Sequence, residues 1–432
     1  MKKLLSYFIA MILTLSLAFV AFACDKEEQE EENVVTGQFK YELVTEKRDN
    51  LEKPELDDDG KEVKDDLGNT VYEKKDYKFY KITGFTVSSD DATKIANGDF
   101  STVSKYREIT IPATYEELEG ATENHPVEEI GMSALASQAI FTKITVGDNI
   151  KKIGEGAFAG CSNLKELSLP FIGNELTAVN ELKLFGYIFS DSVTENATAV
   201  TGKLHQRVDA SGTVISSEED ITFNVPTSLE KVIIRNETEI KECAFYGMTM
   251  LKEVVLPSAL TNIANHAFFG CASLLKMDIP NTVTEIGDYA FSGATSLYKV
   301  NYDIENSELT TIGAHAFDGC ALLNSSYVQD KVVLKLPKKV ATIGEYAFSG
   351  CTSIKEIDFT NLTLNVYETG VFKGCTALTK VNVNKVNGVV FKIGAFNGCS
   401  LLEADGVLNN GAEFNFDGIN PDVFDFDLPI KV

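Results

Sequence analysis

The residue types in this chain best able to do chemistry are its eight cysteines and four histidines. Pairs of cysteines can form disulfides, and a cysteine close to a histidine can bind Zn²⁺. Six of the cysteines, however, each follow a phenylalanine by three residues, and Met248 and Ala294 occupy the same place after Phe245 and Phe291. A required disulfide would not allow those replacements. We therefore predict that these six are reduced thiols buried as small apolar side chains: Cys161, Cys271, Cys320, Cys351, Cys375 and Cys399.

A zinc pair is conceivable at Cys243 and His266, each of which lies two residues before a repeated phenylalanine. Zinc prefers three or four ligands, and the next equivalent position holds Tyr289. We therefore predict a half-exposed packing column there. An EF-hand beginning at Asp57 is also excluded, because position 12 of such a loop must be Glu and is Gly68 here. We expect no metal and no cofactor.

Composition argues against two further classes of function. The chain of 432 residues carries 39 Lys and Arg against 64 Asp and Glu, a net charge of -25. Such a surface repels phosphate backbones, so nucleic-acid binding is excluded, and it repels anionic lipid headgroups. No GxSxG, P-loop, HExxH or paired-carboxylate signature is present. We expect a protein that is not an enzyme.

The element that positions these residues is a repeat. An Ala-Phe string or its equivalent recurs about every 23 residues, with one longer gap between Phe158 and Phe245. We expect this gap to hold one degenerate unit near Phe185 and an insert around residues 190–224. The repeated phenylalanines are Phe158, Phe245, Phe268, Phe291, Phe317, Phe348, Phe372 and Phe396.

One clean unit spans residues 251–273 and reads LKEVVLPSALTNIANHAFFGCAS. Its apolar positions 1, 4 and 6 predict a strand with one buried face. The Ile-Gly that follows in other units, such as Ile286-Gly287, predicts a turn with positive φ at the glycine. The Ala-Phe-x-x-Cys stretch predicts a short helix or 3₁₀ turn. One unit cannot bury its own apolar residues, so neighbouring units must stack.

This unit resembles the BspA-like class of leucine-rich repeats over roughly residues 127–402. The fold that we expect is an α/β repeat: a leucine-rich-repeat solenoid with a parallel inner β-sheet, short helices or turns on the outer side, and a small β-rich N-terminal cap. We place the cap at residues 37–112, the solenoid at 113–403 and a C-terminal tail at 404–432.

The N-terminus predicts export. Two lysines precede an apolar run, and we assign residues 1–23 to a signal peptide, an uncleaved membrane helix being the alternative. The Ala-Phe-Ala-Cys ending resembles a bacterial lipoprotein processing box, which implies a lipid anchor on Cys24. Residues 24–36 are then an acidic tether, or a surface-export signal of the kind seen in some Gram-negative anaerobes. We expect a protein anchored at the bacterial cell surface, in contact with the membrane only through this lipid.

The exposed face of the inner sheet is where we expect ligand binding. One column of outward residues alternates mostly in charge, which predicts cross-strand ion pairs. The next column contains no aromatic side chain, which argues against sugar stacking, but Ile233 and Val255 make a small apolar patch in it. The candidate binding residues are Lys231, Ile233, Glu253, Val255, Lys276 and Asp278.

These observations, with what the resemblance implies, predict a non-enzymatic adhesin that contacts an extracellular or host-surface protein. One alternative is a glycan-binding accessory lipoprotein for nutrient uptake, which would need an exposed aromatic cluster. Another is an envelope scaffold without a soluble ligand. Repeat arrays bind many unrelated targets, so the sequence specifies neither the ligand nor the oligomeric state.

Overall fold

The computed structural model describes residues 39–57, 61–65, 69–97, 103–114, 121–190, 197–204, 219–324, 327–328, 331–383 and 389–400. The expected signal peptide at 1–23, the lipid-bearing Cys24, the tether at 24–36 and the tail at 404–432 lie outside these residues, as does part of the insert.

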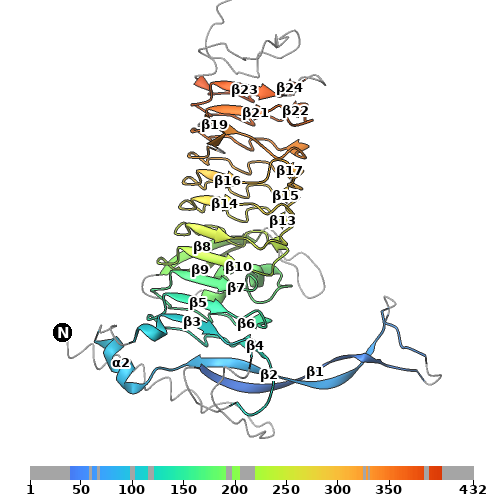
Figure 1. The fold of residues 1–432 in the computed structure, drawn as a ribbon, viewed down its shortest axis with the longest axis vertical. Coiled ribbons are helices and arrows are strands. Elements are labelled where there is room, and N and C mark those ends of the chain that lie inside the picture. Colours follow the sequence, from blue (N-terminus) through green and yellow to red (C-terminus); the bar gives the residue numbers. More distant parts are fainter. Residues whose placement is uncertain are drawn as a thin grey trace, which may run out of the picture. The chain divides into compact units, whose positions relative to one another are not determined.

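The largest sheet has seven parallel strands in chain order, one from each successive unit (Figure 1). Its middle positions, such as Ile144, Leu167 and Val232, are fully buried, as the spacing of apolar residues in the repeat predicts. The expected leucine-rich-repeat solenoid with a parallel sheet is confirmed. The first strand lies within the range expected for the cap, so the cap residues contribute to the sheet. The strands are β3 (Glu108–Ile111), β5 (Lys143–Val146), β7 (Glu166–Leu169), β10 (Lys231–Ile234), β12 (Glu253–Val255), β14 (Lys276–Asp278) and β16 (Lys299–Asn301).

The sheet pattern continues in the later units. There, β19 pairs in parallel with β21, and β21 with β23. A short strand, β18, pairs antiparallel with β19. The bounds are β18 (Tyr327–Val328), β19 (Lys331–Leu334), β21 (Glu356–Phe359) and β23 (Lys380–Val383).

A second parallel sheet forms at the Ile-Gly segments, where we expected only a turn. Five successive units each give it a two-residue strand that ends in a buried apolar residue, such as Ile263 or Ile286. The expected positive φ is wrong for the glycines of this pair: the described positive-φ glycines do not include Gly154, Gly287, Gly313 or Gly344. The five-stranded part comprises β11 (Glu239–Ile240), β13 (Asn262–Ile263), β15 (Glu285–Ile286), β17 (Thr311–Ile312) and β20 (Thr342–Ile343), and the pair β22 (Val366–Tyr367) and β24 (Val390–Phe391) is built in the same way.

Where glycine follows one of these short strands, it is needed because successive units approach closely. A Cβ on Gly344 would lie 2.4 Å from the backbone nitrogen of Ala314 in the preceding unit. At Gly154 the corresponding distance, to the nitrogen of Met132, is 2.3 Å. Only a residue without a side chain permits this contact.

The Ala-Phe-x-x-Cys segments form turns, as expected. The Cys271 amide donates to the Phe268 carbonyl at 3.2 Å within one turn, and the Phe268 amide donates to Ala290 in the next unit at 2.7 Å. The phenylalanine rings stack face to face along the array. From Phe268 to Phe291 to Phe317 the ring centroids are 5.1 and 5.3 Å apart.

The six repeated cysteines are buried, and no disulfide joins the cysteines of the described chain, which confirms the packing prediction. Each thiol donates to a carbonyl of the preceding unit, as Cys271 Sγ does to Phe245 at 3.2 Å. Burial raises the pKa of the Cys161 thiol to about 12, and the pKa values of Cys271 and Cys320 are raised for the same reason. These thiols therefore stay protonated and serve as packing groups.

The degenerate unit lies where the long gap predicts it. The 3₁₀ helix η4 (Phe185–Phe189) inserts two buried rings between those of Phe158 and Phe245. Its Ile188 carbonyl accepts the Phe158 amide at 2.9 Å, so the hydrogen-bond ladder continues through it. A shorter 3₁₀ helix, η3 (Asn180–Lys183), precedes it. The antiparallel strands β8 (Ala197–Leu204) and β9 (Glu219–Pro226) belong to the insert.

The N-terminal residues form the expected hairpin. Strand β1 (Phe39–Pro54) pairs antiparallel with β2 (Tyr72–Phe85), followed by α2 (Ser89–Ala96) and the 3₁₀ helix η1 (Ser104–Tyr106). Strand β2 also pairs in parallel with β4 (Val127–Ile130), which pairs with β6 (Lys152–Ile153). The hairpin thus extends a sheet of the array.

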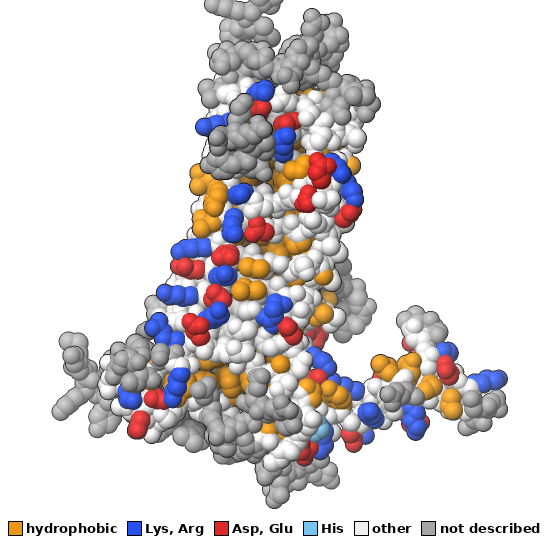
Figure 2. All heavy atoms as spheres, in the orientation of Figure 1, with side chains coloured by type: hydrophobic (Ala, Val, Ile, Leu, Met, Phe, Trp, Pro, Cys, Tyr) orange, Lys and Arg blue, Asp and Glu red, His pale blue; other side chains and the backbone are white. Residues whose placement is uncertain are grey.

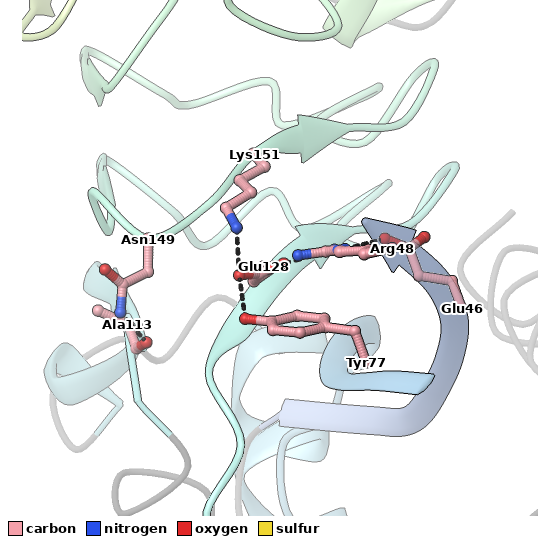
Figure 3. Close-up of polar contacts among 7 residues, drawn as sticks. All are labelled: Glu46, Arg48, Tyr77, Ala113, Glu128, Asn149 and Lys151. Atoms are coloured by element: carbon pink, nitrogen blue, oxygen red, sulfur yellow. Dashed lines mark hydrogen bonds and ion pairs between the residues drawn. The ribbon is translucent and has the colours of Figure 1, made fainter. Parts of the chain in front are cut away.

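A buried carboxylate joins the hairpin to the first units (Figure 3). Glu128 on β4 is 3% exposed and lies 2.7 Å from the Arg48 guanidinium of β1. The Tyr77 hydroxyl of β2 donates to it at 2.9 Å, and Lys151 of the next unit donates at 2.6 Å. Burial opposes ionisation of Glu128, but these hydrogen bonds outweigh it and leave its pKa lowered. Groups from the hairpin and from the next unit converge on this one carboxylate, which is the arrangement of a structural junction.

Candidate binding face of the seven-stranded sheet

The structure brings the six candidate binding residues together on three adjacent strands. Lys231 on β10 is in register with Glu253 on β12, and Glu253 with Lys276 on β14. Ile233 is in register with Val255, and Asp278 lies on β14 beyond Lys276. In Figure 2, basic and acidic side chains alternate along the array over these strands.

The expected cross-strand ion pairs are present in the first part of the sheet. Lys143 Nζ lies 3.0 Å from Glu166 Oε1, and Lys231 Nζ lies 3.4 Å from Glu253 Oε1. The alternation then ends. Lys276 is in register with Lys299 and forms its ion pair within its own strand, with Asp278 at 3.5 Å. This end of the face therefore carries two adjacent cations, which raises its local positive charge within a strongly acidic protein.

The apolar patch expected from the sequence is exposed. Val255 is 39% exposed, and Ile233 beside it is half-buried. Arg235, two residues after Ile233 in the chain, donates from Nε to Asp148 at 2.8 Å. An apolar pair surrounded by charged groups has the composition of a small protein-protein contact.

A groove runs beside the charged column, and the sequence reasoning missed its two large apolar side chains, Leu275 and Tyr298. Its volume is about 420 Å³, and its lining includes Lys231, Glu253 and Lys276. Leu275 and Tyr298 also line it, and they are 43% and 44% exposed. The column of Ile233 and Val255 contains no aromatic side chain, as expected, but Tyr298 places one at the edge of the face. Tyr298 directly precedes β16 and lies one position before the column of charged residues. The signal in the sequence that could have identified it is a large apolar side chain at that position.

The histidine column beside the repeated phenylalanines is a packing column, as expected. The His266 ring stacks on Tyr289 with centroids 5.0 Å apart, Tyr289 on His315 at 4.5 Å, and His315 on Tyr346 at 4.9 Å. All four residues are half-buried and have φ between 54° and 56°. The faces of the rings in this column cover one another, so the stack presents ring edges.

In the part of the chain that the structure describes, no helix combines the length and apolar character that a membrane crossing requires.

Comparisons with known proteins agree with this architecture. The family profile of the BspA type leucine-rich repeat region matches in six copies, over residues 70–194, 219–334 and 330–410. No curated protein sequence matches the chain.

Several solved structures are similar. A leucine-rich repeat protein from Eubacterium ventriosum is 17% identical, with 85% of this chain and 94% of that chain covered and a TM-score of 0.36. A leucine-rich cell surface protein from Faecalibacterium prausnitzii is 21% identical, with 88% of each chain covered and a TM-score of 0.30. The pneumococcal vaccine antigen PcpA is 15% identical, with 85% and 79% covered and a TM-score of 0.33. Because these TM-scores are low, the assignment depends on the profile, which covers more than half of the chain. The chain belongs to the family of BspA type leucine-rich repeat proteins.

Proposed function

We propose that this protein is a non-enzymatic adhesin, held at the bacterial surface through Cys24, that binds an extracellular or host protein with the face of its seven-stranded sheet. The observation that carries the proposal is the groove beside the ion-pair column, where Leu275 and Tyr298 are exposed directly before strands β14 and β16.

This face has the parts that protein contacts use. Tyrosine is among the residues that contribute most to binding energy, and here Tyr298 stands next to the aliphatic Leu275. Polar groups surround these apolar side chains: the ion pair of Lys231 with Glu253 and the cations Lys276 and Lys299. Hydrogen bonding to neighbouring strands fixes the backbone, so little conformational entropy is lost on binding.

Surface display is supported by the N-terminal sequence and by the family. An apolar run that ends in Cys24 precedes an acidic stretch, which would hold the array away from the membrane. One similar solved structure is itself described as a cell surface protein.

A glycan ligand is the second candidate, because Tyr298 offers an exposed aromatic ring that sugars can stack against. Among the described residues of this face it is the single exposed ring, and a sugar platform gains from several. The scaffold alternative predicts that neither class of ligand binds.

The test is to probe arrays of extracellular-matrix proteins and of glycans with the purified full chain. We expect protein hits that persist in about 0.5 M salt, since apolar contacts are not screened. Glycan hits alone would replace the adhesin proposal with the nutrient-uptake one, and silence on both arrays would favour the scaffold.

A further inference from the structure

We propose that Glu242, Cys243 and His266 form a binding site for Zn²⁺ that joins two neighbouring units of the array. One ligand atom from each, a carboxylate oxygen, the sulfur and a ring nitrogen, all lie within 4.8 Å of one another. Glu242 and Cys243 follow strand β11, and His266 follows β13 in the next unit. Register between these two strands brings the three groups together.

The donor set selects the metal. Thiolate, imidazole and carboxylate are the ligands that Zn²⁺ takes in proteins, and three protein ligands leave one position for water. Ligand atoms around one tetrahedral zinc lie roughly 3.5 Å apart, given metal-ligand distances of about 2.0–2.3 Å. A movement of about 1 Å therefore closes the site, and the Glu242 side chain, 36% exposed, has the freedom to make it.

Cys243 differs from the other cysteines that the structure describes. They lie three residues after a phenylalanine and donate to a core carbonyl, whereas Cys243 occupies the column that holds His266 and Tyr289 in the following units. Its side chain is 1% exposed and packs with Leu184 and Phe223. These two residues come from the segment before η4 and from the insert strand β9, so a metal here would also stabilise the base of the insert.

The sequence offers only two ligands along the column, because Tyr289 follows His266. The third ligand comes from Glu242, the chain neighbour of Cys243. Following one column of equivalent positions from unit to unit does not reveal a ligand that is the chain neighbour of a column residue. The backbone supplies it, because φ of 57° at Cys243 turns the chain between the two residues.

Lys183 competes with the metal in the present arrangement, since its Nζ lies 3.4 Å from Glu242 Oε2. On binding, the Cys243 thiol loses its proton to solvent, its sulfur bonds to the metal, and the Lys183 ammonium leaves the carboxylate. Affinity should therefore rise with pH and should rise further in Lys183→Met.

The experiment is titration of the reduced, chelator-treated full chain with Co²⁺, followed by optical absorption. We expect one equivalent to bind with a thiolate-to-cobalt charge-transfer band and the visible bands of tetrahedral cobalt, and Zn²⁺ to displace it. Cys243→Ser should abolish the charge-transfer band, and His266→Gln and Glu242→Gln should weaken binding at least roughly tenfold. His315→Gln, two units further along the same column, and Cys24→Ala should leave binding unchanged.

The proposal is overturned if the wild-type chain shows no charge-transfer band, or if the band survives in Cys243→Ser or disappears in Cys24→Ala. Should Cys243→Ser fail to fold because its site is buried, His266→Gln decides, since His266 is half-buried. Unchanged cobalt affinity in a folded His266→Gln variant contradicts the site.

Discussion

Lys231 on β10 and Glu253 on β12 form an ion pair across two parallel strands, with Nζ 3.4 Å from Oε1. Both side chains are about one third exposed, at 33% and 39%. The pair occupies the face that we propose binds a partner, so its charges are partly satisfied before binding. What this face offers in addition is the exposed apolar surface of Val255, Leu275 and Tyr298.

A double-mutant cycle on this pair should give a small coupling energy. We expect Lys231→Ala and Glu253→Ala to show an interaction of about 0.2–1 kcal/mol, because solvent screens a half-exposed pair. Urea unfolding of the wild type, both single variants and the double variant measures it. The coupling should shrink in about 1 M salt, and a coupling that salt does not change would show that contacts other than charge join the two residues.

The phenylalanine stack should dominate stability. Phe291 is fully buried between Phe268 and Phe317, so Phe291→Ala should lower the free energy of unfolding by about 3–5 kcal/mol through the cavity that it leaves. Chemical denaturation gives the value. Leu275→Ala, at a side chain 43% exposed, is the matched control and should change stability by less than about 1 kcal/mol. Equal losses in the two variants would refute a core built on the stacked rings.

The junction at Glu128 should make stability depend on pH in acid. Its pKa is lowered in the folded chain from an ordinary value of 4.5, so the ionised form stabilises the fold above that pH. The contribution is lost as pH falls below about 4.5, through the folded pKa, because the carboxylate must then take up a proton.

Thermal unfolding of the wild type and of Glu128→Gln, followed between about pH 3 and pH 7, tests this effect. At neutral pH the variant should be less stable by about 1–3 kcal/mol, since Arg48 and Lys151 lose their shared carboxylate. The difference should shrink toward pH 3. A difference that stays constant with pH would mean that the Glu128 charge does not contribute.

The repeat made most of the fold predictable from the sequence. Residues such as Phe291 and Cys320 have equivalents at the same position in other units, and such periodicity specifies which side chains face the core. The second sheet was not predictable, because a two-residue strand such as Glu285–Ile286 has too few residues to show an alternating pattern. Gly287 was assigned to a turn for the same reason, whereas close approach of the preceding unit is what requires it.

The candidate site was predictable only in part. Lys231 and Val255 were found because their columns were followed from unit to unit. Tyr298 was missed because it precedes its strand. Glu242 was missed because the fold of the chain brings it close to His266, whereas the repeat spacing does not relate the two positions. Positions between the regular columns depend on turn geometry, which the repeat pattern does not encode.

The measurement that tests the central claim most directly is adherence of full-length variants to the extracellular protein that the array identifies. Leu275→Asp with Tyr298→Ala alters the groove, and Ile233→Asp with Val255→Asp alters the patch. Leu176→Asp with Val179→Asp is the control, at exposed apolar residues outside the seven-stranded sheet. We predict at least a tenfold loss of affinity in the groove variant, a smaller loss in the patch variant, and none in the control. Unchanged binding in folded groove and patch variants would contradict the assignment of this face as the binding site.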